Sequence, residues 1–204
     1  MYELLHSFIQ QLFPHCQVDV ARLEPLLESR IVLRDFLFQE GDLCDFVGLT
    51  LKGCLRSFFL KDGKELTLFF HPEHHTLGDY ESFRRQTPAY FSCQAIEDSE
   101  ILILTTQAIA ALETMPDGQK LLRLVVESLA FQLRDRLLSL HRDSPEQQYL
   151  NFLKSEPQLL QRIPQHYLAS HLGIEPESSE PIKAKNSRET IDLTQVNARY
   201  SSTQ

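Results

Sequence analysis

The feature that most constrains the fold is a series of short apolar runs between residues 31 and 105, separated by turn-forming residues. Strands at a spacing of about 8–12 residues favour a β-sandwich or barrel over alternating strand–helix units. Asp62-Gly63 lies between two of the runs and predicts a tight hairpin turn, because this pair tolerates positive φ. The expected strands cover residues 31–38, 46–52, 54–60, 64–70, 90–95 and 100–105.

Helical spacing of apolar residues flanks this β-rich region on both sides. Pro14 ends the first expected helix, and Thr105 or Thr106 is the expected N-cap of the helix that follows the last strand. The expected helices cover residues 2–12, 18–29, 106–114, 119–141, 145–154 and 165–172. We therefore predict an α+β protein with N-terminal helices, a jelly-roll-like β-roll, a long helix and a small C-terminal segment.

The expected long helix, residues 119–141, carries an apolar seam. Its apolar positions recur at steps of three or four residues, with Arg136 or Leu137 at one of them, which is typical of the seam of a coiled coil. This spacing predicts a homodimer, whereas the alternative is a single amphipathic helix that covers the β-roll. The expected interface consists of Leu122, Val125, Val126, Leu129, Leu133, Leu137 and Leu140.

Composition limits the class of protein. A chain of 204 residues with 42% hydrophobic and 24% charged residues is typical of a globular protein with one large or two small domains. The net charge of −8 argues against nucleic-acid affinity over the whole surface, although a local basic patch is compatible with it. No apolar run approaches the ~20 residues that span a bilayer, and the first residues lack a signal-peptide pattern. We therefore expect a cytoplasmic protein without a membrane partner.

Three segments in this order resemble the CRP/FNR family of transcription regulators. They are Phe38-x-Glu40-Gly41-Asp42, the Gly78-Asp79-Tyr80-Glu81 segment before the long helix, and a helix-turn-helix-like segment from residue 165. The resemblance implies a non-enzymatic, homodimeric, DNA-binding regulator with a small-molecule effector that the sequence does not identify. It divides the chain into a cyclic-nucleotide-binding-like sensor (1–116), a dimerisation helix (117–143), a helix-turn-helix segment (144–184) and a polar, poorly ordered tail (185–204).

The same resemblance implies an effector pocket in the second half of the β-roll. In nucleotide-binding members, backbone amides and an arginine hold the phosphate, but here Ala89 or Tyr90 takes the arginine position. Arg84 and Arg85 precede the turn and are expected to face solvent, while Tyr90 and Phe91 would crowd the space. We therefore predict no tight binding of a cyclic nucleotide, because a buried phosphodiester needs a fixed cation. The candidate pocket residues are Leu77, Gly78, Asp79, Tyr80, Glu81, Ser82, Ala89 and Tyr90.

The first half of the helix-turn-helix-like segment resembles that of Bacteroidetes-type family members, through Leu168, Ala169, Leu172, Gly173 and Ile174. The second half departs from the pattern. Ser179 replaces an apolar core residue, Pro181 interrupts the expected winged-helix recognition helix, and Glu177 and Glu180 would repel phosphates. We therefore expect weak or absent specific DNA binding, and the alternative function is a ligand-binding or protein-interaction module that has lost DNA binding. The candidate DNA contacts are Gln165, His166, Ser178, Ser179, Lys183 and Lys185.

Cofactor chemistry has little support in the sequence. Cys16, Cys44, Cys54 and Cys93 are scattered, so neither a disulfide framework nor an iron–sulfur cluster is expected. The residues 71–75, which include three histidines, lack the His-x-His pair of a cupin-like metal enzyme, and we interpret them as a polar loop. The expectation is therefore no metal and no cofactor.

Overall fold

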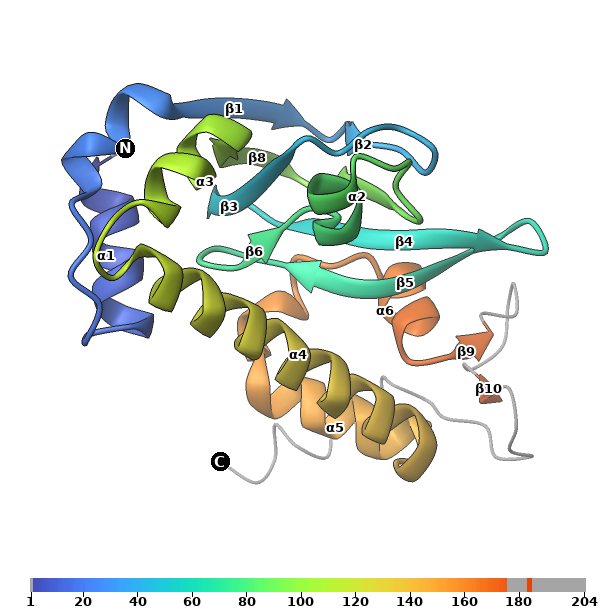
Figure 1. Cartoon of the computed structure of the whole chain (residues 1–204). Coiled ribbons are helices and arrows are strands. Elements are labelled where there is room, and N and C mark those ends of the chain that lie inside the picture. Colours follow the sequence, from blue (N-terminus) through green and yellow to red (C-terminus); the bar gives the residue numbers. More distant parts are fainter. Residues whose placement is uncertain (1, 176–182, 185–204) are drawn as a thin grey trace. The chain divides into compact units, whose positions relative to one another are not determined.

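The computed structural model describes residues 2–175 and 183–184 (Figure 1). These residues divide into two compact units. The first contains the chain up to residue 59 together with residues 69–135, and the second contains residues 60–68 together with the part from residue 136. The chain therefore crosses from one unit to the other in a hairpin and within the long helix.

Two antiparallel four-stranded sheets form most of the first unit. Their orders are β1-β8-β3-β6 and β2-β7-β4-β5. Asp62 and Gly63 both have positive φ, 53° and 75°, at the tip of the β4–β5 hairpin, so the predicted turn is confirmed. The strands are β1 (Leu27–Leu33), β2 (Phe36–Phe38), β3 (Phe46–Lys52), β4 (Leu55–Lys61), β5 (Lys64–His71), β6 (Thr76–Leu77), β7 (Ser92–Ala95) and β8 (Asp98–Thr105).

The N-terminal region differs from the prediction in one place. Helix α1 (Tyr2–Leu12) is confirmed, but the predicted helix 18–29 is wrong. Two short 3-10 turns, η1 (Val20–Arg22) and η2 (Glu24–Leu26), take its place, and β1 begins at Leu27. Pro25 removes one backbone donor in this stretch, and the pairing of Leu27 with Leu104 extends the sheet instead.

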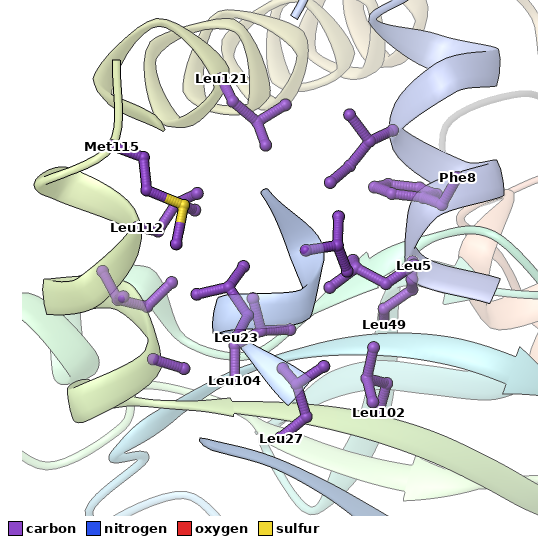
Figure 2. Packing of buried hydrophobic residues seen from close by; sticks show 14 of the residues in the cluster. Leu5, Phe8, Leu23, Leu27, Leu49, Leu102, Leu104, Leu112, Met115 and Leu121 are labelled. Atoms are coloured by element: carbon purple, nitrogen blue, oxygen red, sulfur yellow. The ribbon is translucent and has the colours of Figure 1, made fainter. Parts of the chain in front are cut away.

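A helical layer covers one face of the β1-β8-β3-β6 sheet. Figure 2 shows side chains from α1, from the segment before β1, from the strands and from the helices after β8 meeting in one apolar cluster. Helix α3 (Thr106–Glu113) has the predicted N-cap, because the Thr105 hydroxyl accepts the Ala108 N–H. The buried members labelled in Figure 2 are Leu5, Phe8, Leu23, Leu27, Leu49, Leu102, Leu104, Leu112, Met115 and Leu121.

The opposite face of this sheet lines the interior of the β-roll. Successive residues of β8 alternate between the two cores, because neighbouring side chains of a strand point to opposite faces. Leu102 and Leu104 belong to the helix-side cluster, whereas Ile101 and Ile103 belong to the roll interior. The roll interior contains Val32, Leu37, Phe38, Cys44, Phe46, Leu55, Leu77, Ala89, Cys93, Ala95, Ile101 and Ile103.

A long helix, α4 (Gly118–Arg142), follows α3, as predicted. The second unit continues from residue 136 of this helix. Its further elements are α5 (Pro145–Ser155), η3 (Pro157–Leu159), α6 (Gln165–His171), β9 (Ile174–Glu175) and β10 (Lys183–Ala184). Ser144 caps α5 by accepting the Gln147 N–H, and Gly173 ends the α6 region with φ of +70°. The expected helices 145–154 and 165–172 are therefore confirmed to within one residue.

Candidate effector site

The Gly78-Asp79 turn opens a short helix, α2 (Tyr80–Arg85), that the sequence did not predict. The Asp79 carboxylate is its N-cap: one oxygen accepts the N–H groups of Glu81 at 3.1 Å and Ser82 at 3.0 Å. The other oxygen accepts the Tyr90 N–H at 3.0 Å. The residue is only 5% exposed, so three backbone donors enclose a buried carboxylate at the point where the resemblance implies an effector.

Ser82 fixes the remaining part of this turn. Its hydroxyl donates to the Thr87 carbonyl at 2.6 Å and accepts the Cys44 N–H at 3.0 Å. Gly78 has φ of +122°, and a Cβ there would lie 3.1 Å from the Phe46 carbonyl oxygen, so a glycine suits this position. The turn is therefore held from inside the β-roll through buried polar groups.

The Gly41-Asp42 turn closes the same region from the other side. The Gly41 N–H donates to the Ala89 carbonyl at 2.9 Å, and the Ala89 N–H donates to the Asp42 carbonyl at 2.8 Å. Ala89 itself is buried in the roll interior, at the position where a phosphate-binding arginine was considered. The N–H and the C=O of Ala89 are therefore both used in hydrogen bonds with the Gly41-Asp42 turn.

The arginines near this site bind other partners. Arg84 pairs with Glu113 at 3.1 Å and Arg85 pairs with Glu81 at 3.1 Å, and both side chains are largely exposed. This agrees with the expectation that they face solvent. One further arginine, Arg56 on β4, is buried, which the sequence analysis missed. Its guanidinium lies 3.9 Å from the Phe58 ring centroid and donates to the Gln94 side-chain oxygen at 2.9 Å.

A serine–histidine pair, in which Ser57 is buried and His71 is half-buried, also lies in the roll. The Ser57 hydroxyl and His71 Nε2 are 2.8 Å apart, and His71 Nδ1 is 3.0 Å from the Thr76 carbonyl oxygen. Burial lowers the pKa of His71 to about 4, and the nearby His75 lowers it further, while the hydrogen bond to Thr76 acts in the opposite direction. His71 is therefore neutral at pH 7, so it supplies no positive charge to an anion.

The predicted pocket residues fall into two groups. Asp79, Ser82, Leu77 and Ala89 are buried in the roll interior or its polar edge, whereas Tyr80, Glu81 and Tyr90 are partly or largely exposed. The idea that Tyr90 crowds the pocket is wrong, because its side chain is 69% exposed. Phe91 packs on Phe38, with ring centroids 5.7 Å apart. The sequence does carry a signal for the N-cap of α2. Asp79 follows a glycine, and an aspartate at an N-cap accepts the backbone N–H groups two and three residues later.

The predicted dimer seam also divides into two parts. Leu122 and Val125 are half-buried against the helix-side cluster of the same chain, and Leu129 is half-buried. The later positions are exposed: Leu133 and Leu137 at 57% each and Leu140 at 49%. Val126, Phe131 and Leu138 add exposed apolar surface to the same helix. Among the predicted seam residues, Val126, Leu133, Leu137 and Leu140 are therefore exposed, whereas Leu122, Val125 and Leu129 are half-buried.

The candidate DNA contacts are only partly described. Gln165 and His166 are exposed at the start of α6, which is the first helix of the expected helix-turn-helix. Ser178, Ser179 and Lys185 lie outside the described residues, as do Pro181 and the 185–204 tail. Lys183 lies in strand β10, opposite Glu175 of strand β9. The sequence had instead predicted that Lys183 lies at the end of a recognition helix.

All four cysteines are buried free thiols. Burial raises the pKa of Cys93 and of Cys44 above the ordinary thiol value. Within residues 2–175 and 183–184, histidine, cysteine and acidic side chains do not gather in threes as metal ligands would. None of the described helices combines the length and apolar character needed to cross a membrane.

Comparison with known proteins identifies the domain type of the β-roll. Residues 31–114 match the family model of the cyclic nucleotide-binding domain. No curated protein sequence matches the chain.

Several solved structures share the fold. FixK2 from Bradyrhizobium japonicum is 16% identical, with a TM-score of 0.63 over 85% of this chain and 86% of that chain. The c-di-GMP-responsive global regulator CLP from Xanthomonas campestris is 18% identical, with a TM-score of 0.61 over 76% and 83% of the two chains. A transcriptional regulator described as a Crp/Fnr family member, from Eubacterium rectale, is 17% identical, with a TM-score of 0.62 over 79% of each chain. These likenesses support a cyclic nucleotide-binding-domain β-roll followed by a long helix.

Proposed function

We propose that this chain is a homodimeric, non-enzymatic transcription regulator of the CRP/FNR type whose β-roll does not bind cyclic nucleotides. The observation that carries the second part is the Asp79 carboxylate, which already accepts the Tyr90 N–H and the first two amides of α2. A phosphate at this turn would have to compete with the Asp79 carboxylate for these N–H groups. The domain match and the fold likenesses support the first part.

Electrostatics and space both favour a neutral or apolar effector. Burying an anion without a paired cation costs several kcal/mol, and Ala89 supplies none. The neighbouring Asp79 carboxylate would add repulsion at short range, where screening by salt is weak. Phe38, Phe46 and Phe91 line the same part of the roll, with Phe38 and Phe46 ring centroids 6.2 Å apart. A small molecule that binds here would therefore contact aromatic rings more than charges.

Isothermal titration calorimetry tests the effector class. We expect cyclic AMP and cyclic GMP to give no heat of binding, which corresponds to dissociation constants weaker than about 1 mM. The variant Asp79→Ala/Ala89→Arg releases three amides and adds a cation, so we expect it to bind at least one of these nucleotides measurably. Micromolar binding by the wild type would contradict the proposal, and the single variants Arg84→Ala and Arg85→Ala would then show which cation replaced the missing one.

DNA binding is the part of the proposal that depends on the C-terminal segment. Helix α6 is present, and Leu168 and Ala169 are buried as a first helix of this motif requires. A second candidate function is favoured because the two residues after Gly173, Ile174 and Glu175, form strand β9 and not the start of a helix. That second candidate is a ligand-binding or protein-interaction module without DNA binding.

Gel-shift titration against a pool of genomic fragments separates the two candidates. We expect weak binding by the wild type and tighter binding by the triple variant Ser179→Leu/Glu180→Ser/Pro181→Arg, which adds a core leucine, removes a carboxylate and a proline, and adds a phosphate contact. Nanomolar, sequence-specific binding by the wild type would show an unimpaired regulator. Absence of binding by both proteins would favour the interaction module.

A further inference from the structure

Strand β1 forms an open edge of the β1-β8-β3-β6 sheet. It pairs with β8 without a bulge from Leu27 to Leu33, and β8 is its only strand partner among the described residues. Alternate residues of an antiparallel end strand direct their N–H and C=O groups away from the sheet. Natural proteins usually shorten, bulge or cover such an edge, because it can pair with another strand. β1 is long and regular, so its outer side can accept a further strand.

Two apolar side chains at the end of β1 are exposed. Leu27 belongs to the helix-side cluster and Val32 to the roll interior, so the odd-numbered residues of β1 face the helical layer. Ile31 and Leu33 share this face with Leu27, yet they are 70% and 66% exposed. The two β8 residues opposite them are acidic and supply no apolar cover. A further strand with apolar residues at two alternate positions would pack against both side chains.

The other face of β1 carries a positive charge close to these residues. Arg30 is exposed, and its guanidinium carbon lies 5.4 Å from the centroid of the Phe46 ring, which belongs to the roll interior. Val32 lies on the same face, two residues further along the strand. A residue opposite Val32 on an added strand would be a diagonal neighbour of Arg30, within reach of a long side chain. The edge therefore suits an extended segment in which an acidic residue stands between two apolar ones.

The polar tail of this chain contains such a segment. It is Thr190-Ile191-Asp192-Leu193-Thr194, which lies outside the described residues. Its alternation of β-branched or apolar residues with polar ones is the pattern of a strand with one packed face. The described pairs of the β1-β8-β3-β6 sheet are all antiparallel, and antiparallel pairing is slightly more stable per residue, so we expect this orientation for an added strand.

We propose that residues 190–194 of a second copy of this chain dock on the outer edge of β1 as an additional antiparallel strand. Ile191 then lies opposite Leu33, and Leu193 lies opposite Ile31. The carboxylate between the two apolar residues falls on the roll face, diagonal to Arg30. The backbone of the segment pairs with the outward N–H and C=O groups of β1. This docking rests on the proposed homodimer, which supplies the second copy.

Disulfide trapping in the full chain tests the docking. Two single variants, Leu33→Cys and Ile191→Cys with tags of different size, are mixed and mildly oxidised. We expect a covalent heterodimer, because opposite residues of antiparallel strands have Cα atoms about 4.5–5.5 Å apart, within the range of a disulfide. The four native cysteines are buried, so the introduced pair should react first. Glu28→Cys mixed with Ile191→Cys is the matched control, and it should react about tenfold more slowly, because Glu28 lies on the other face of β1.

A charge exchange tests the register. Arg30→Glu in the Leu33→Cys protein should slow the crosslink about threefold, and Asp192→Arg in the Ile191→Cys protein should restore the rate. Equal rates for the Leu33 and Glu28 mixtures would overturn the docking. Faster reaction of Ile191→Cys with Ile31→Cys than with Leu33→Cys would overturn the antiparallel register.

The outcome for the second copy can be separated from that of the homodimer. If the double variant Leu33→Cys/Ile191→Cys closes its disulfide only within one chain, the choice of a second copy is wrong. Light scattering on the same proteins reports their assembly independently of the crosslink. A monomeric wild type would overturn the homodimer and the docking together, whereas a dimer that does not crosslink would overturn the docking alone.

Discussion

Replacing Gly53 by alanine should lower the free energy of unfolding by about 2–5 kcal/mol. Gly53 joins β3 to β4 with φ of +89°, a region that costs other residues about 1–2 kcal/mol. A Cβ there would also lie 2.8 Å from the Asp98 carbonyl oxygen and the Ser99 Cα, and closer still to the Ser99 hydroxyl. Because the Asp98 oxygen and the Ser99 Cα belong to the backbone, the Cβ of an alanine fits only if β3, β4 or the turn between them shifts.

Gly63→Ala is the matched control for this prediction. Gly63 also lies between two strands with positive φ, but no heavy atom lies within 4 Å of its missing Cβ. We expect this change to cost only the backbone strain, about 1–2 kcal/mol. Chemical denaturation of both variants, followed by circular dichroism, gives the two free energies. Equal losses of stability would contradict the steric argument at Gly53.

The second large effect concerns assembly. We expect the wild type to have twice the 23.6 kDa chain mass in light scattering, and Leu133→Glu/Leu137→Glu to have the monomer mass. Each leucine contributes about 1.5–3 kcal/mol when it is fully buried, and a dimer loses two from each helix. That loss is comparable with the ~8 kcal/mol that holds a dimer with a micromolar dissociation constant.

The control for the dimer experiment lies on the same helix. Gln132→Glu adds a carboxylate beside Leu133 at an exposed position outside the seam, so we expect it to leave the dimer intact. Leu122→Glu would be less informative, because Leu122 packs against the helix-side cluster of its own chain and its loss would destabilise the fold. A wild type that is monomeric at micromolar concentration would contradict the proposed homodimer and favour the alternative of a helix that only covers its own β-roll.

Elements with strong local signals could be predicted from the sequence. The periodicity of α4, the Thr105 cap of α3 and the Asp62-Gly63 turn all depend on residues that are close in the chain. The helix expected at 18–29 was wrong because apolar spacing there is compatible with two structures, and long-range pairing with β8 decided for the strand. Local pattern alone does not contain that information.

The candidate site was predicted less completely, for a related reason. Helix α2 has six residues, too few for a periodic signal, and its cap takes a third donor, Tyr90, from beyond the following turn. Arg56 is a charged residue within an apolar run, and its burial depends on the Phe58 ring and on Gln94, which lies on β7. The absence of an arginine at Ala89 could be predicted from the sequence, whereas the hydrogen bond from the Tyr90 N–H to the Asp79 carboxylate could not.

Strand β8 has a consequence for how this protein can evolve and respond. Its residues Ile101 and Ile103 fill the roll while Leu102 and Leu104 fill the helix-side cluster, so the strand has no solvent-facing side along this stretch. A change of volume at any of these four positions must be absorbed by one core or transmitted to the other, because packed interiors leave little free space. We therefore expect the roll and the helical layer to unfold together. A change of packing inside the roll would therefore reach the helical layer through strand β8.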